Sequence, residues 1–222
     1  MSAGGPPAAP DGGPGGEQAA GRLIPLFPLH TVLFPGGVLP LHVFEERYRL
    51  LVQERRDFGV VLIRQGSEVG PGRGEDVMPV GTVATLEEVH ALPDGRFYVL
   101  GRGLDRFRIQ SLDHSRPYLS AQVEILDQPS PTPRPRLFQV LERYLRLRGL
   151  ELADEVRAEL RVGGPALVWT AGSLLEVEPA KRQQLLETGD AELAESLLSA
   201  EAAKLEAIGE LGSVPPRRPE PN

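Results

Sequence analysis

Residues 23–44, LIPLFPLHTVLFPGGVLPLHVF, combine apolar side chains with repeated chain breaks. The breaks are Pro25, Pro28, Pro40 and the segment from Pro35 to Gly37. Proline has no backbone N–H to donate to a neighbouring strand, so it is tolerated mainly at sheet edges and bulges. The stretch therefore predicts short β-strands with edge or bulged pairing and a turn at residues 35–37.

The next segment has the spacing of a short amphipathic helix. Phe44, Tyr48, Leu51 and Val52 fall at i, i+4, i+7 and i+8, with charged residues between them. This spacing places the four side chains on one helix face, which we expect to pack on the sheet. A strand at residues 59–63 follows.

Residues 79–126 have the pattern of a β-meander. We expect strands at residues 81–92, 96–101, 104–112 and 118–126, with a hairpin turn at residues 93–95 (Pro-Asp-Gly). In the last strand, apolar residues from Leu119 to Ile125 alternate with polar ones, which predicts one buried and one solvated face.

After a proline-rich connector at residues 128–135, the composition changes to one that favours helices. One helix carries Leu137, Val140, Leu141, Tyr144 and Leu145 on a single face. Gly163-Gly164-Pro165 breaks the chain, Glu178-Pro179 begins another helix, and a last helix covers residues 190–209. The predicted fold class is α+β, with a β-rich first part and a helical bundle after it.

Composition sets the outer limits of this organisation. We expect residues 1–21, rich in Gly, Ala and Pro, and residues 212–222, rich in Pro, to be disordered tails. The folded part then comprises a β-rich unit at 22–128 and a helical unit at 129–211. No apolar run reaches membrane-spanning length and no secretory signal is present, which favours the cytoplasm.

Residue content argues against several kinds of enzyme. The chain has no cysteine, which excludes thiolate catalysis and cysteine-ligated metals. His30, His42, His90 and His114 lack the spacing of a helical zinc site. The glycine-rich segment 66–75 lacks the lysine of a phosphate-binding loop. Asp113-His114-Ser115 is predicted to be a turn, because the members of a catalytic triad come from separate segments. We therefore expect no catalytic residue, no cofactor and no metal.

Arg102, Arg106 and Arg108, near Phe97, Tyr98 and Phe107, form the one feature that suits single-stranded nucleic acid. Strand alternation points Phe107 away from Arg106 and Arg108, so the simpler interpretation is packing inside and charge outside. The formal net charge of −7 also makes nucleic acid an unfavoured partner.

Several ordered motifs resemble the N-terminal domain of Lon proteases. They include Leu26-Phe27-Pro28-Leu29, Val32-Leu33-Phe34-Pro35-Gly36, Leu39 to Tyr48, Val80 to Ala84, Leu92 to Arg96, Gly101 to Ile109, Pro117 to Glu124 and Pro179 to Glu187. The resemblance covers about residues 23–210. It implies a PUA-like pseudo-barrel followed by a helical bundle, in a region that takes part in recognising protein substrates. The ATPase and the serine–lysine protease of Lon lie in further domains, and we expect neither here.

The leading hypothesis is accordingly a non-catalytic module that binds exposed segments of other proteins, as an adaptor, with a full-length Lon or another protease as a further partner. Leu33, Phe34 and Pro35 are candidate protein contacts, with a core role as the alternative. A second hypothesis is an RNA-binding PUA-like module. A third, a hydrolase, requires His, Ser and Asp to converge from separate segments.

Overall fold

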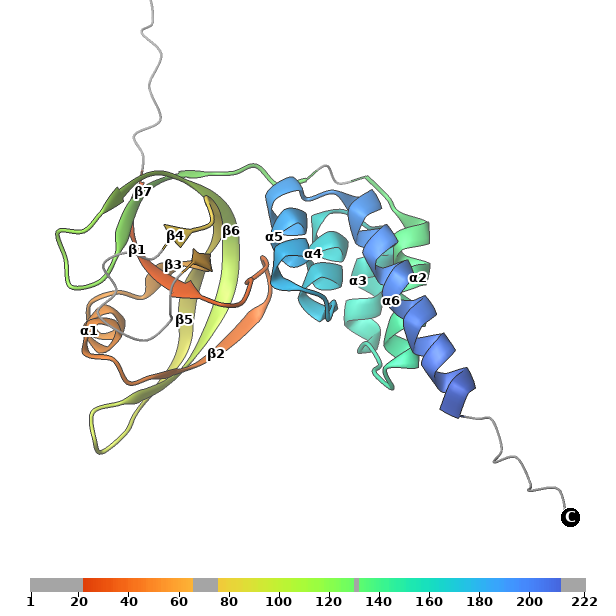
Figure 1. Ribbon diagram of the computed structural model, residues 1–222, viewed down its shortest axis with the longest axis horizontal. Helices are drawn as coiled ribbons and strands as arrows, with labels where there is room; N and C mark the ends of the chain where they lie inside the picture. Colours follow the sequence, from red (N-terminus) through yellow and green to blue (C-terminus); the bar gives the residue numbers. More distant parts are fainter. Residues whose placement is uncertain (1–21, 66–75, 130–131, 213–222) are drawn as a thin grey trace, which may run out of the picture.

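The computed structural model describes residues 22–65, 76–129 and 132–212, and Figure 1 shows a β-barrel beside a group of helices. The two predicted tails, the glycine-rich segment 66–75 and part of the proline-rich connector lie outside the described residues. The strands are β1 (Arg22–Leu29), β2 (Val38–Val43), β3 (Asp57–Gln65), β4 (Asp76–Val77), β5 (Val80–Ala91), β6 (Phe97–Asp113) and β7 (Ser120–Ile125).

Five strands close on themselves to form the predicted pseudo-barrel. The order β1-β7-β6-β5-β3 is antiparallel, and a parallel pairing of β1 with β3, beginning at Leu26 and Gly59, completes the ring. β4 extends the sheet from β3, and β2 pairs with β6. Closure leaves few open strand edges, which lowers the risk of edge-to-edge association.

Prolines mark the place where β1 changes partners. Residues Arg22 to Pro25 pair with β7, whereas Leu26 to Leu29 pair with β3. Pro25 and Pro28 therefore stand in stretches where the ladder is formed mainly on one side, and Pro40 lies in β2, which pairs only with β6. The prediction of edge-like pairing is confirmed, with the addition that β1 belongs to a closed barrel.

Helix α1 (Glu46–Glu54) packs on the barrel through Tyr48, Leu51 and Val52, which are all buried. The predicted helix face is therefore confirmed for these three residues. Phe44 is the exception, because it precedes the helix and is exposed.

The helical part follows the predicted breaks closely. Its elements are α2 (Pro135–Leu147), α3 (Asp154–Val162), α4 (Pro165–Leu174), α5 (Pro179–Thr188) and α6 (Ala191–Gly212). Gly163 and Gly164 adopt positive φ angles of 88° and 90° between α3 and α4, a backbone conformation that side chains with a Cβ rarely tolerate. Proline then begins α4 and α5, where its missing N–H is not needed.

β6 differs from the expectation because it is one continuous strand from Phe97 to Asp113 and not two. The expected strands at residues 96–101 and 104–112 left a gap at residues 102–103. Gly103 instead allows a close approach, since a Cβ there would lie 2.3 Å from the carbonyl oxygen of Phe34. The two backbones also exchange hydrogen bonds, from Gly36 N to Gly103 O and from Gly103 N to Gly37 O, each 2.8 Å.

One of the buried hydrophobic clusters spans the barrel and the helices. Phe34, Val80 and Leu62 from the barrel side belong to the same buried cluster as Trp169 and Leu185 from the helices. The helical bundle is therefore packed against the barrel wall, as Figure 1 shows for α5 and β6.

Candidate protein-binding surface

An exposed apolar surface lies around strand β2. We call it the β2 surface and define it by Val38, Pro40, His42, Phe44 and Tyr98. Val38, Phe44 and Tyr98 are 51%, 47% and 53% exposed, although each carries a large apolar side chain. Exposed apolar residues that gather in this way mark interaction sites more often than residues that lie singly.

The aromatic members of the β2 surface contact one another. His42 pairs across the ladder with Tyr98, and their rings stack with centroids 4.7 Å apart. The Phe44 ring also contacts His42, with ring centroids 5.8 Å apart and the two planes tilted by 48°. These two contacts join the three rings into an aromatic row, which loses less side-chain entropy when a partner covers it than three separate rings would.

A small cavity of about 200 Å³ adjoins this row. It lies between β2 and the end of β1, and its walls include Phe27, Leu29, Leu41 and Phe44. Phe27 is held in place by stacking on Tyr48, with centroids 4.0 Å apart. The lining offers an apolar site for a side chain of a bound polypeptide.

β2 also offers a free backbone edge. It pairs with β6 from Val38 opposite Arg102 to Val43 opposite Phe97, and within residues 22–65 and 76–129 no strand pairs with its other side. An unpaired strand edge can accept an extended segment of another chain. Pro40 limits the backbone pairing that this edge can form with a bound segment, because it has no N–H to donate.

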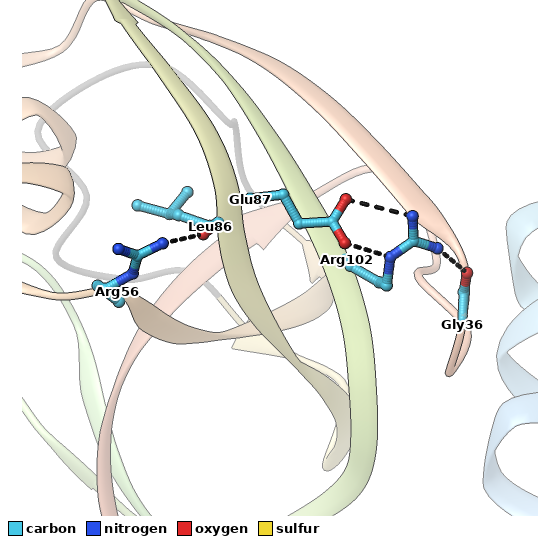
Figure 2. A network of polar contacts seen from close by, with 5 residues as sticks. All are labelled: Gly36, Arg56, Leu86, Glu87 and Arg102. Carbon is cyan, nitrogen blue, oxygen red and sulfur yellow. Dashed lines mark hydrogen bonds and ion pairs between the residues drawn. The ribbon is translucent and has the colours of Figure 1, made fainter.

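Arg102 fixes the beginning of β2, as Figure 2 shows. Its Nη2 donates to Glu87 Oε2 at 3.2 Å, its Nε donates to Glu87 Oε1, and its Nη1 donates to the carbonyl oxygen of Gly36 at 3.2 Å. The hydrogen bond with Glu87 raises the pKa of Arg102. One guanidinium thus ties β6 to β5 and to the turn before β2.

Arg106 was expected to point into solvent, and this prediction is wrong. Its side chain is 6% exposed and lies over the ring of Trp169, with its guanidinium carbon 4.9 Å from the ring centroid. Nη1 donates to the carbonyl oxygen of Leu186 at 2.8 Å, and Nη2 donates to that of Asp127 at 2.6 Å. Burial lowers the pKa of Arg106.

The three arginines therefore do not form a continuous basic stripe. Arg102 is engaged with Glu87, Arg106 joins the barrel to α5, and Arg108 is exposed. Phe107 is fully buried, which confirms its predicted inward direction.

Leu33, Phe34 and Pro35 are placed in or near the core. Leu33 and Phe34 are buried, and Pro35 is partly buried. The Phe34 ring packs against Gly172 and lies 6.2 Å from the Trp169 ring, while Arg182 lies over its face at 5.6 Å. The structure thus gives Leu33 and Phe34 the core role that the sequence left open as an alternative.

Sequence reasoning missed the β2 surface. Tyr98 was named only as part of a nucleic-acid face, and Phe44 was assigned to a buried helix face. A signal for the exposure of Phe44 is its position before Glu45 and Glu46. The helix begins only at Glu46, so Phe44 lies outside the helix and not on its buried face.

The residues considered for chemistry include the segment Asp113-His114-Ser115 and the possible metal ligands. Asp113 ends β6, and His114 and Ser115 begin the bend that leads towards β7. The backbone N–H of Ser115 donates to Asp113 Oδ1 at 2.8 Å and lowers the pKa of that carboxyl. Among the described residues, no three His, Asp or Glu side chains are arranged to hold a metal ion. In the same part of the chain, no helix is long and apolar enough to cross a membrane.

Comparison with known proteins identifies the family. Residues 23–194 match the model of the ATP-dependent protease La (LON) substrate-binding domain. The Lon protease of Escherichia coli strain K12 is 31% identical over 180 residues, which cover 75% of this chain and 23% of that protein. The Lon protease of Lawsonia intracellularis is 29% identical over 177 residues, or 74% of this chain and 21% of that protein. The chain thus spans less than a quarter of the length of these relatives.

Solved structures agree with this assignment. The Lon N-terminal domain protein from Xanthomonas campestris superposes with a TM-score of 0.61 at 29% identity, covering 80% of this chain and 98% of that one. The N-terminal domain of Mycobacterium avium complex Lon protease shares the fold, with a TM-score of 0.53 at 19% identity over 82% of this chain and 98% of that one. The chain belongs to the family of the Lon substrate-binding domain.

Proposed function

We propose that this chain is a non-catalytic module that binds exposed apolar segments of other proteins through the β2 surface. The observation that carries the proposal is the aromatic row of His42, Phe44 and Tyr98 beside a mostly apolar cavity. Membership of a substrate-binding domain family supports the same class of ligand.

The geometry suits a polypeptide in extended form. A segment lying along the free edge of β2 would present alternate side chains to the cavity lined by Phe27 and Leu29. Because Pro40 removes one donor from this edge, side-chain burial contributes more to affinity than the backbone ladder does. Binding of this kind depends on the apolar content and extended conformation of a peptide more than on one particular sequence.

The partners follow from the same reasoning. As an adaptor in the cytoplasm, the module would hold exposed segments of other proteins for a full-length Lon or another protease. The RNA alternative loses its main support, because Arg102 is paired with Glu87 and Arg106 is buried.

The test is a fluorescence anisotropy titration of the full chain with labelled, extended peptides rich in Leu and Phe. The variant Phe44→Ser with Tyr98→Ser removes two aromatic side chains that are about half exposed. Losing their burial on binding is expected to weaken affinity at least about tenfold. The control is Val162→Ser with Ile208→Ser, since these two apolar residues are 72% and 65% exposed on α3 and α6.

If the Phe44/Tyr98 variant kept its peptide affinity, or if the control variant lost as much peptide affinity, the β2 surface would not be the binding site. A parallel titration with a labelled single-stranded RNA decides between the two classes of ligand. Tight RNA binding without peptide binding would overturn the proposed function.

A further inference from the structure

A second cavity, of about 330 Å³, opens on the barrel wall beside β1. Four arginines line it, Arg22, Arg55, Arg56 and Arg116, together with the carboxylates Glu54 and Asp57. Four guanidinium groups against two carboxylates leave two net positive charges, on a chain whose formal net charge is −7. We call this cavity the arginine cleft.

The change of partners in β1 explains why the cleft exists. From Arg22 to Pro25 the strand pairs with β7, and its pairing with β3 begins only at Leu26 opposite Gly59. Among the described strands, none is hydrogen-bonded to residues 22–25 on the β3 side of the barrel wall. The segment that leads from α1 into β3 borders this gap and supplies Arg55 and Arg56.

The arginines keep donors available for a ligand. Arg22 contacts Asp57 at 3.1 Å, Arg116 contacts Glu54 at 3.3 Å, and Arg56 donates to the carbonyl oxygen of Leu86 at 2.9 Å, the last shown in Figure 2. A guanidinium carries five N–H donors, so each of these contacts leaves several unused.

Arg55 and Ser120 add to the donors in the cleft. Across the described part of the chain, the Arg55 side chain forms no hydrogen bond or ion pair that would occupy it. Ser120, which is only 2% exposed, also contributes to the lining. Exposed arginine donors and a nearly buried serine thus surround the same space.

We propose that the arginine cleft is a binding site for an oxyanion, either a carboxylate of a polypeptide or a phosphate group. The forked guanidinium geometry matches two oxygens of such a group, and several arginines around one concave site strengthen the attraction. No residue lines both this cleft and the cavity beside β2, so the inference stands apart from the proposed function.

The experiment is isothermal titration of the full chain with inorganic pyrophosphate at low ionic strength. The test variant is Arg22→Gln with Arg55→Gln, and the control is Arg108→Gln with Arg146→Gln, two exposed arginines outside the cleft. Both variants lose the same charge, so a general electrostatic effect would weaken binding equally. We expect the test variant to bind about tenfold more weakly than the control.

Two peptides distinguish the source of the oxyanion. One is an N-acetylated Gly-Ser peptide with a free C-terminal carboxylate, and the other is the same peptide as its C-terminal amide. Carboxylate-dependent binding that the test variant loses assigns the cleft to polypeptide carboxylates, and binding of pyrophosphate alone assigns it to phosphate. Equal affinity of test and control variants, or no binding of either anion by the unmodified chain, would overturn the proposal.

Discussion

Replacing Arg106 by Met should destabilise the joint between the barrel and the helices. The guanidinium donates to the main-chain carbonyls of Leu186, at 2.8 Å, and Asp127, at 2.6 Å, and makes a longer contact of 3.3 Å with Glu187. Leu186 and Glu187 lie in the last turn of α5, where carbonyls have no partner within the helix and carry the negative end of its dipole. Arg106 therefore caps α5 from the barrel side.

The magnitude follows from the two shorter contacts. A hydrogen bond from a charged donor contributes about 1.5–3 kcal/mol, and its loss leaves a buried acceptor unsatisfied. Removing the guanidinium also removes the cost of burying a charge, which offsets part of this. Since Met keeps an unbranched apolar stem against Trp169, we expect a net loss of about 3 kcal/mol, or about 6–12 °C in Tm for a chain of this size.

Urea unfolding followed by fluorescence measures this directly, because Trp169 is the single tryptophan and is buried beside Arg106. Arg108→Met, two positions along the same strand and exposed, is the control and should change stability by less than about 0.5 kcal/mol. If Arg106→Met changed the free energy of unfolding as little as Arg108→Met does, the capping argument would be refuted. The cost of burying the charge would then equal the gain from its hydrogen bonds.

Two further predictions concern stability. Gly103→Ala places a Cβ 2.3 Å from the carbonyl oxygen of Phe34 and should lower the free energy of unfolding by about 2 kcal/mol or more. In Gly209→Ala on α6 the new Cβ meets nothing within 4 Å, so this variant should raise it by about 0.5–1 kcal/mol. Urea titration of both variants measures the two changes. The hydrogen bond from Arg148 holds the pKa of Glu176 below its usual value, so this contact stabilises the fold above the unfolded pKa of about 4.3 and is lost as pH falls through the lower folded pKa. Glu176→Gln should therefore be less stable than the unmodified chain at neutral pH, and the two melting curves should converge in acid; a constant difference at every pH would contradict this.

Local signals in the sequence were sufficient for most element boundaries. Proline at position 179 and the Gly163-Gly164-Pro165 break locate the helix ends, because the backbone restrictions of these residues act without help from distant parts of the chain. The alternation gave the buried positions of Leu119, Ala121 and Val123 correctly. It failed at two other positions, because Ile125 is 43% exposed and Ser120 is buried.

The errors arose where distant segments meet. Alternation along β6 assigns Arg106 to the outer face of the barrel, which is correct for the barrel alone. Only the packing of α5 against that face buries the residue, and no local pattern contains this information. The continuity of β6 through Gly103 was missed for the same reason, since the backbone that approaches this glycine belongs to Phe34, far away in the sequence.

The candidate surface was the hardest part to predict. Leu33 and Phe34 looked like loop residues with little cover, yet both are buried. The helices cover Phe34, and residues of the barrel and α1 cover Leu33. Phe44 and Tyr98 come to the same surface only when β2 pairs with β6, which brings Tyr98 against His42, the ring that Phe44 also contacts. Within the motifs Gly101 to Ile109 and Pro179 to Glu187, Arg106 and Gln183 join the barrel to the helices, so these motifs identify the family without marking the binding surface.

Hydrogen exchange of the full chain, with and without an excess of a permanently unfolded polypeptide, tests the central claim most directly. The account predicts slower exchange on binding in residues 38–44 and 97–100, which form and adjoin the β2 surface, and unchanged exchange in α3. Protection confined to the helical bundle, or no protection anywhere at saturating polypeptide, would contradict the assignment of the β2 surface as the site that holds other proteins.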